Sequence, residues 1–160
     1  MKNLNKYFAG FMFVILSISI LGLAGYSNAA DVESAHDRQA ILEGAKQMLD
    51  GNKVVVDIMT KKGKKDADLT AAEKMMSDGY NMVVKGESMM TGSTTAEGKD
   101  MVTRGANMMM AAEKATKACV EKHGMVQECS GGLDTCAIGD KKVKAAFQTY
   151  GLSGNWEEQR

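Results

Sequence analysis

The residues in this chain whose types most clearly suggest chemistry are its methionines. The stretch "KMMSDGYNMVVKGESMM", residues 74–90, holds five of the fourteen methionines in the sequence. Thioether sulfur is a soft ligand that suits Cu(I) and related ions. A metal site needs donors that converge on one point, so they would have to come from neighbouring helices. Met82 and Met108, which fall in two successive predicted helices, are the candidate ligands for such a site.

Packing is the alternative interpretation of the methionines, and we prefer it. Met75, Met82 and Met89 recur every seven residues, which places them about 10.5 Å apart along one helix. That spacing suits association between helices better than a compact site of three sulfurs. Methionine also fills irregular gaps between helices, and glycines opposite it allow the backbones to approach closely.

Three cysteines and a histidine form the second group with chemical potential, in "CVEKHGMVQECSGGLDTC". In an exported protein we expect one disulfide among Cys119, Cys129 and Cys136, with one thiol left over, and the sequence leaves all three pairings open. The alternative is a zinc site that adds His123 to the three cysteines. The spacings contain no C-x₂-C pair, so the disulfide is the preferred prediction.

Neither the motifs nor the charge of the chain indicates an enzyme or a nucleic-acid-binding protein. His36 and His123 are the only histidines, and the phosphate-binding, dinucleotide and hydrolase motifs are missing from the sequence. We therefore predict no catalytic activity and no cofactor. The 20 basic residues balance the 20 acidic ones, and such a chain lacks the basic patch that nucleic acid requires.

The N-terminus predicts export. Lys2 and Lys6 precede an apolar run over residues 8–23, and small residues lead up to Ala30. This order is typical of a secretory signal peptide, here residues 1–29. An uncleaved membrane anchor is the alternative. We predict a periplasmic or secreted protein with no membrane contact after cleavage.

A repeat predicts the elements that must position these side chains. Gly51, Gly79 and Gly105 align three similar units, and small and large residues within them alternate at spacings of three and four. This pattern indicates heptad seams, as in a coiled coil. The predicted packing seam consists of Gly44, Met48, Gly51, Met75, Gly79, Met82, Gly86, Met89, Gly98, Met101, Gly105 and Met108.

The predicted fold is all-α, in one domain over residues 30–160. Three helices, at about 32–62, 69–91 and 95–123, form an up-down bundle, and Gly63, Gly92 and Gly124 are the expected helix stops. A tail held by the disulfide follows, with a short fourth helix at 140–150.

Two classes of function remain for such a protein. The first is a non-catalytic structural or interaction role, with a second copy of the chain or another exported protein as the partner. The alternative is a periplasmic protein that binds Cu(I) or Ag(I) through methionine, or zinc through cysteine and histidine.

Overall fold

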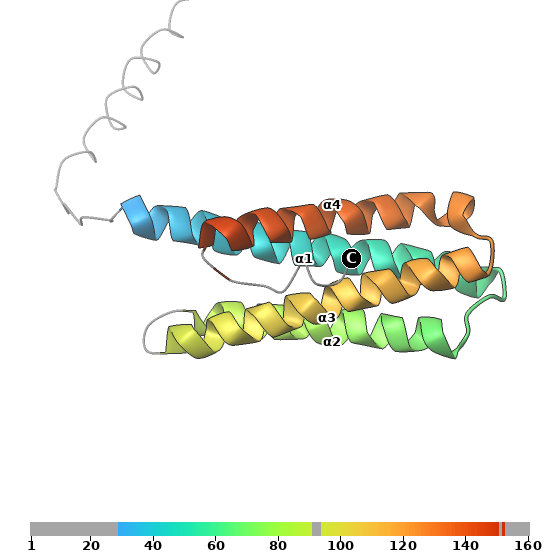
Figure 1. Cartoon of the computed structure of the whole chain (residues 1–160), viewed down its shortest axis with the longest axis horizontal. Helices are drawn as coiled ribbons and strands as arrows, with labels where there is room; N and C mark the ends of the chain where they lie inside the picture. Colours follow the sequence, from blue (N-terminus) through green and yellow to red (C-terminus); the bar gives the residue numbers. More distant parts are fainter. Residues whose placement is uncertain (1–28, 91–93, 151, 153–160) are drawn as a thin grey trace, which may run out of the picture.

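The computed structural model describes residues 29–90, 94–150 and 152, and the elements in these ranges are four α-helices (Figure 1). They are α1 (Ala29–Lys61), α2 (Ala67–Met89), α3 (Thr95–Lys122) and α4 (Val126–Tyr150). The helices pack as a bundle. The predicted signal peptide lies outside the described residues, apart from Ala29 at the start of α1.

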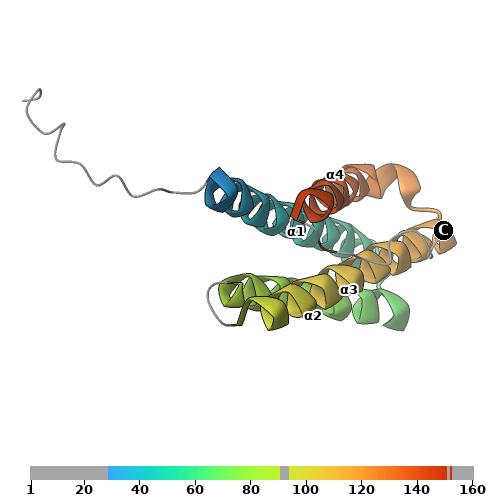
Figure 2. The same ribbon diagram turned by 60° about the vertical axis from the view of Figure 1, so that its left-hand side comes forward.

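The bundle consists of two helix pairs, α1 with α4 and α2 with α3, which Figures 1 and 2 show as separate layers. In the α2/α3 pair, a β-carbon added to Gly79 would lie 2.7 Å from the carbonyl oxygen of Gly105. One added to Gly86 would lie 2.8 Å from the carbonyl oxygen of Gly98. Residue numbers rise along one helix as they fall along the other, so the two helices are antiparallel.

The α1/α4 pair repeats this arrangement with its own glycines. A β-carbon on Gly44 would lie 2.8 Å from the carbonyl oxygen of Gly139, and one on Gly51 would lie 2.6 Å from that of Gly132. Non-bonded carbon and oxygen atoms do not approach so closely, so these positions require glycine unless the helices move apart. The six glycines of the predicted seam all lie at such contacts.

The length of α4 corrects the sequence-based prediction. The predicted short helix at 140–150 is the end of a helix that begins at Val126, and the predicted tail forms its first half. Within α4, Gly132 and Gly139 are the partners of Gly51 and Gly44. Close packing against α1 outweighs their low helix propensity. The result is four long helices in two pairs, where three long helices and a short fourth had been expected.

A second regularity places the core beside the glycine contacts. Each of the eight contact glycines is followed four residues later by a buried side chain. These side chains are Met48, Val55, Val83, Met90, Val102, Met109, Cys136 and Val143. They contribute to the apolar interior between the two pairs, which also contains the fully buried Phe147 and Ile41.

Polar contacts also join the two pairs. Arg38 of α1 donates to the Glu87 carboxylate of α2 through Nε, at 3.0 Å, and through Nη2, at 2.5 Å. Inside the bundle, the Asn52 Nδ2 of α1 donates to the Thr116 Oγ1 of α3 at 2.7 Å, with both side chains buried. Because each of these polar groups has a partner across the pairs, the contacts favour one relative placement of the pairs.

Two of the three predicted helix stops lie within the described residues. Gly63 and Gly124 have φ angles of 66° and 65°, the left-handed conformation that glycine adopts at helix ends. Gly92 lies outside the described residues. Over the described ranges, no helix combines the length and the apolar character needed to cross a membrane.

Alanine substitutions test the glycine contacts. Gly105→Ala should lower the free energy of unfolding by about 1 to 3 kcal/mol, because its β-carbon would lie 2.6 Å from the Gly79 carbonyl oxygen. Gly131→Ala is the matched control, since within the described residues no atom outside its own stretch of helix lies within 4 Å of its β-carbon position. It should stabilise the protein by up to about 1 kcal/mol through helix propensity alone. Urea denaturation measures both changes, and a stabilising Gly105→Ala would contradict the packing.

Candidate functional site

The two helix pairs differ in the residue that lies three positions after each contact glycine. In the α2/α3 pair, each contact glycine is followed three residues later by methionine, in "GYNM", "GESM", "GKDM" and "GANM". The equivalent positions in the α1/α4 pair hold Gln47, Val54, Thr135 and Lys142. Both pairs make the same backbone contacts. Glycine packing therefore does not require methionine at this position.

These four methionines, Met82, Met89, Met101 and Met108, are called here the outer methionine face. With about 100° of rotation per residue, positions three and four after a glycine lie on opposite sides of it. The positions four residues on face the core, so the positions three residues on face away from it. All four methionines are half-buried, and none contributes to or packs against the two core clusters of the described residues.

The face brings together methionines from two helices. The Met82 Cβ lies 2.8 Å from the position of a β-carbon on Gly105, and the Met108 Cβ lies 3.1 Å from that of one on Gly79. Both side chains therefore border the same glycine contact. Side chains on a helix lean toward its N-terminus, so in this antiparallel pair Met82 and Met108 lean toward each other. At the contact of Gly86 with Gly98, the Met89 carbonyl carbon lies 2.8 Å from the position of a β-carbon on Gly98. Met101 follows Gly98 by three residues, as Met108 follows Gly105.

The other methionines of the predicted seam have different surroundings. Met48 is buried in the core, whereas Met75 is half-buried at the edge of the core. Within the pairs of adjacent methionines, the core holds Met76, Met90 and Met109. The sequence predicted the outer neighbour of each as a seam residue. The regular Gly-x-x-Met spacing was visible in the sequence and could have separated the two sets.

The cysteines lie in the interior as free thiols. Cys119, Cys129 and Cys136 are all buried, and the described residues contain no disulfide. This corrects the predicted disulfide. Cys129 and Cys136 stand seven residues apart on α4, about 10.5 Å along its axis, too far for a disulfide. The Cys136 thiol donates to the Met48 carbonyl oxygen at 3.2 Å. Burial, helped by the negative charge of Glu113, raises the pKa of Cys136 to about 12.

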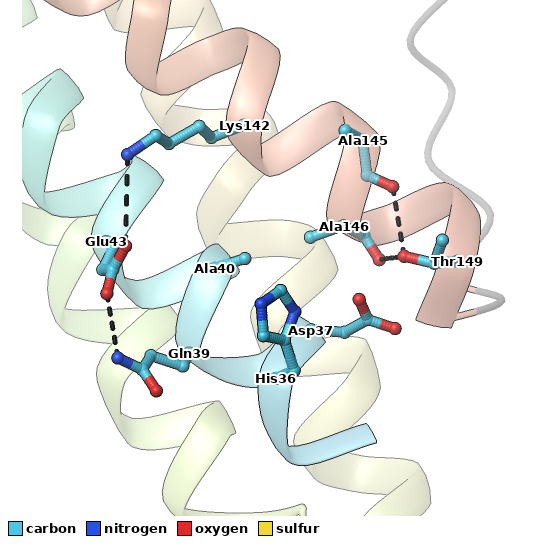
Figure 3. A pocket seen from close by; sticks show the side chains of 9 residues that line it. All are labelled: His36, Asp37, Gln39, Ala40, Glu43, Lys142, Ala145, Ala146 and Thr149. Carbon is cyan, nitrogen blue, oxygen red and sulfur yellow. Dashed lines mark hydrogen bonds and ion pairs between the residues drawn. The ribbon is translucent and has the colours of Figure 1, made fainter. Parts of the chain in front are cut away.

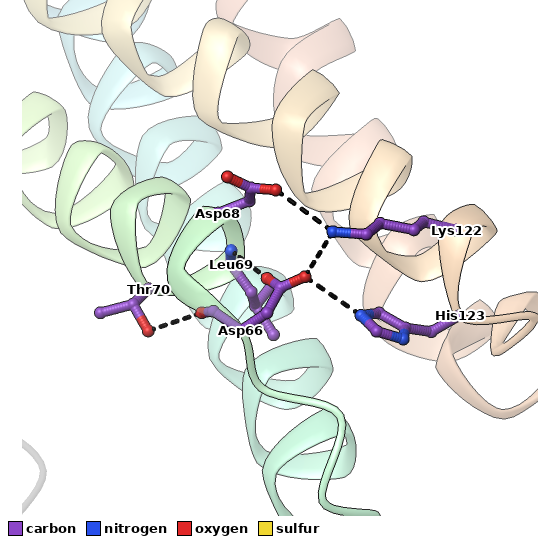
Figure 4. Close-up of polar contacts among 6 residues, drawn as sticks. All are labelled: Asp66, Asp68, Leu69, Thr70, Lys122 and His123. Carbon is purple, nitrogen blue, oxygen red and sulfur yellow. Dashed lines mark hydrogen bonds and ion pairs between the residues drawn. The ribbon is translucent and has the colours of Figure 1, made fainter.

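His123 lies in a polar cluster at the end of α3 (Figure 4). Its Nε2 is 3.1 Å from the Asp66 Oδ2, and the Lys122 Nζ is 2.8 Å from the same oxygen. Asp66 also accepts from the Leu69 N–H at 2.9 Å and so caps α2. The contacts with Lys122, Leu69 and His123, in that order, hold the pKa of Asp66 well below its usual range. The cluster connects the start of α2 to the end of α3.

The predicted zinc ligands are not brought together. His123 contacts Asp66, and Cys136 lies two turns along α4 from Cys129. In the part of the chain that the structure describes, no three histidine, cysteine, aspartate or glutamate side chains form a group that could hold a metal ion.

An open depression of about 450 Å³ lies between the start of α1 and the end of α4 (Figure 3). His36 and Asp37 line it from α1, and Ala146 and Thr149 line it from α4. Thr149 donates to the backbone oxygens of its own helix, and Glu43 accepts from Gln39 of its own helix. These bonds are structural, and they do not make the depression a candidate site for a reaction.

Glu113 is a half-buried carboxyl on α3 that titrates near neutral pH. Burial, and after it the negative charge of Asp140 of α4, raise its pKa to about 7, against the opposing effect of Lys144 and Lys117. The Lys144 Nζ is 2.7 Å from the Asp140 Oδ2. Glu113 lies one turn before Thr116, the residue that accepts the buried hydrogen bond from Asn52. This arrangement makes the folding of the bundle sensitive to pH.

The chain matches none of the protein-family models, curated proteins or solved structures with which it was compared. Its function therefore has to be inferred from its own residues, and the outer methionine face is the candidate site.

The state of the cysteines can be counted directly. We expect three thiols per chain when the protein is denatured without reductant, because the structure pairs none of them. Before denaturation a thiol reagent should react slowly, since burial raises the pKa of all three thiols. A count of one thiol per chain would restore the disulfide.

Stability should fall as the pH rises from about 4.5 to 7. The unfolded chain releases the Glu113 proton near pH 4.5 and the folded chain near pH 7, so the folded state holds the proton more tightly. Allowing for partial exposure, the loss is on the order of 1 to 2 kcal/mol. Glu113→Gln should remove it, whereas Glu121→Gln, at an exposed position on the same helix, should not. Urea denaturation at pH 5 and pH 8 measures the free energy of unfolding at each pH. An equal change between the two pH values in the wild type and both variants would contradict the prediction.

Proposed function

We propose that this protein is an exported, non-catalytic interaction module that binds through the outer methionine face. The observation that carries the proposal is the internal comparison between the helix pairs. Two pairs with the same glycine contacts differ at four equivalent positions, and methionine occupies all four in one pair and none in the other. Export is supported by the basic, apolar and small-residue order of residues 1–29.

Methionine suits a surface that binds another protein. Its side chain is apolar and flexible, so it adapts to the shape of a partner. Several of the neighbouring charges are balanced by a partner in the same helix, which reduces repulsion between two copies. Lys74 pairs with Asp78 on α2, and Asp100 pairs with Arg104 on α3. A second copy of the chain is therefore the partner that we propose, and another exported protein is the alternative.

Sedimentation equilibrium tests this function. We expect the purified protein, free of metal, to associate reversibly, with about a tenfold weaker association when Met82, Met89, Met101 and Met108 are all replaced by glutamine. The half-buried side chains should tolerate the change, so circular dichroism should stay native. Replacing Gln47 and Thr135 by alanine on the α1/α4 pair is the control and should leave association unchanged. A wild-type protein that stays monomeric at its highest soluble concentration would contradict contact with a second copy.

Binding of a soft metal ion is a second candidate function for the same face. The specific observation in its favour is that Met82 and Met108, from two helices, border one glycine contact on the same side. Convergence from neighbouring helices is what a thioether site requires.

A further inference from the structure

We propose that the α2/α3 pair carries two equivalent sites for a soft monovalent cation, Cu(I) or Ag(I). Each site lies over one glycine contact and uses two thioethers, one from each helix. Met82 with Met108 forms the first, over Gly79 and Gly105, and Met89 with Met101 forms the second, over Gly86 and Gly98. The inference rests on the proposed function in one respect, that the outer methionine face is the surface that binds.

The register of the helices brings each pair of methionines together. Met82 and Met108 each follow a contact glycine by three residues, so their Cα atoms lie on opposite sides of the contact, about 9 Å apart along the axis. Each side chain leans toward its own N-terminus, which for both is the direction of the contact. Three rotatable bonds in each side chain then allow the two sulfurs to approach one ion.

The glycines determine how closely the two sulfurs can meet. The Met82 Cβ lies against Gly105 and the Met108 Cβ against Gly79, so neither methionine faces a bulky side chain across the pair. In the α1/α4 pair, the same approach brings Gln47 and Lys142 to the contact of Gly44 with Gly139. Amide and ammonium groups do not bind a soft cation as thioethers do. The α1/α4 pair is therefore an internal control for the α2/α3 pair, because both have the same glycine contacts but different side chains beside them.

Thioethers also predict how binding depends on pH. Cysteine and histidine must lose a proton before they bind a metal, so their affinity falls in acid. Methionine has no proton to lose, and its affinity should be the same at pH 5 and pH 7. The three cysteine thiols are buried in the bundle, which shields them from the added ions.

Titration of the purified protein with Ag(I), followed by NMR of ¹³C-labelled methionine methyl groups, tests the two sites. We expect the signals of Met82, Met89, Met101 and Met108 to shift together and to saturate at two ions per chain, equally at pH 5 and pH 7. The methyl signals of the buried Met76 and Met109 should not move. Cu(I), added without oxygen, should move the same four signals, and Zn(II) should move none of them.

Leucine substitutions assign each ion to its site. Met82→Leu with Met108→Leu should reduce the stoichiometry from two ions to one and leave the shifts of Met89 and Met101 intact. Met89→Leu with Met101→Leu should give the converse. Met76→Leu with Met109→Leu is the matched control and should still bind two ions. Leucine conserves the volume of methionine, so all three variants should fold.

The proposal fails if Ag(I) moves no outer methionine signal, if it moves only signals near the cysteines, or if two ions still bind to the first double variant. The interaction function fails separately, in the metal-free association experiment. Association that depends on the outer methionines, with no response to Ag(I), would leave a protein contact as the use of this face.

Discussion

Close backbone contact between glycines is the constraint on which the rest of this structure depends. Eight glycines, two in each helix, meet in reciprocal pairs, and a β-carbon on any of them would lie within 3.0 Å of a partner backbone atom. Each glycine costs a helix roughly 1 kcal/mol relative to alanine. The contacts offset this cost, because they hold two long helices close enough to bury their flanking side chains. They also make each pair antiparallel and define its register.

Once the contacts are in place, the rotation of each helix about its axis is determined. The residue four positions after a glycine enters the core, and the residue three positions after it faces outward. Valine, methionine and cysteine occupy the inward positions in all four helices. The outward positions are under no such restriction, which is why the α1/α4 pair can carry Gln47, Thr135 and Lys142 there. Four methionines at the unrestricted positions of the other pair therefore call for an explanation other than packing of the core.

The sequence was sufficient to predict that the fold is helical and where most of the helices begin and end, but it did not predict how the helices pair. The spacing of three and four residues predicted α1, α2 and α3 to within three residues at each end. It failed for the first half of α4, because "CSGGLDTC" combines residues that are typical of turns with two cysteines that suggested a disulfide. Gly132 and Gly139 have the same seven-residue spacing as the other contact glycines. Their role in helix contact is apparent only because they lie opposite Gly51 and Gly44. The same helix excludes one of the three disulfide pairings, since Cys129 and Cys136 lie too far apart on α4 to form a bond.

The methionine doublets show why the side of a seam is harder to predict than the seam itself. Adjacent residues on a helix point about 100° apart, so Met75 and Met76, or Met108 and Met109, both lie near the glycine line. Which of the two methionines faces the core depends on where the second helix pair lies. The sequence of a single helix does not show this position. In the structure, the second methionine of each doublet is buried and the first lies outside or at the edge of the core. In the function that we propose, stability and binding therefore belong to different side chains, so a ligand on the outer methionines would leave the core unchanged.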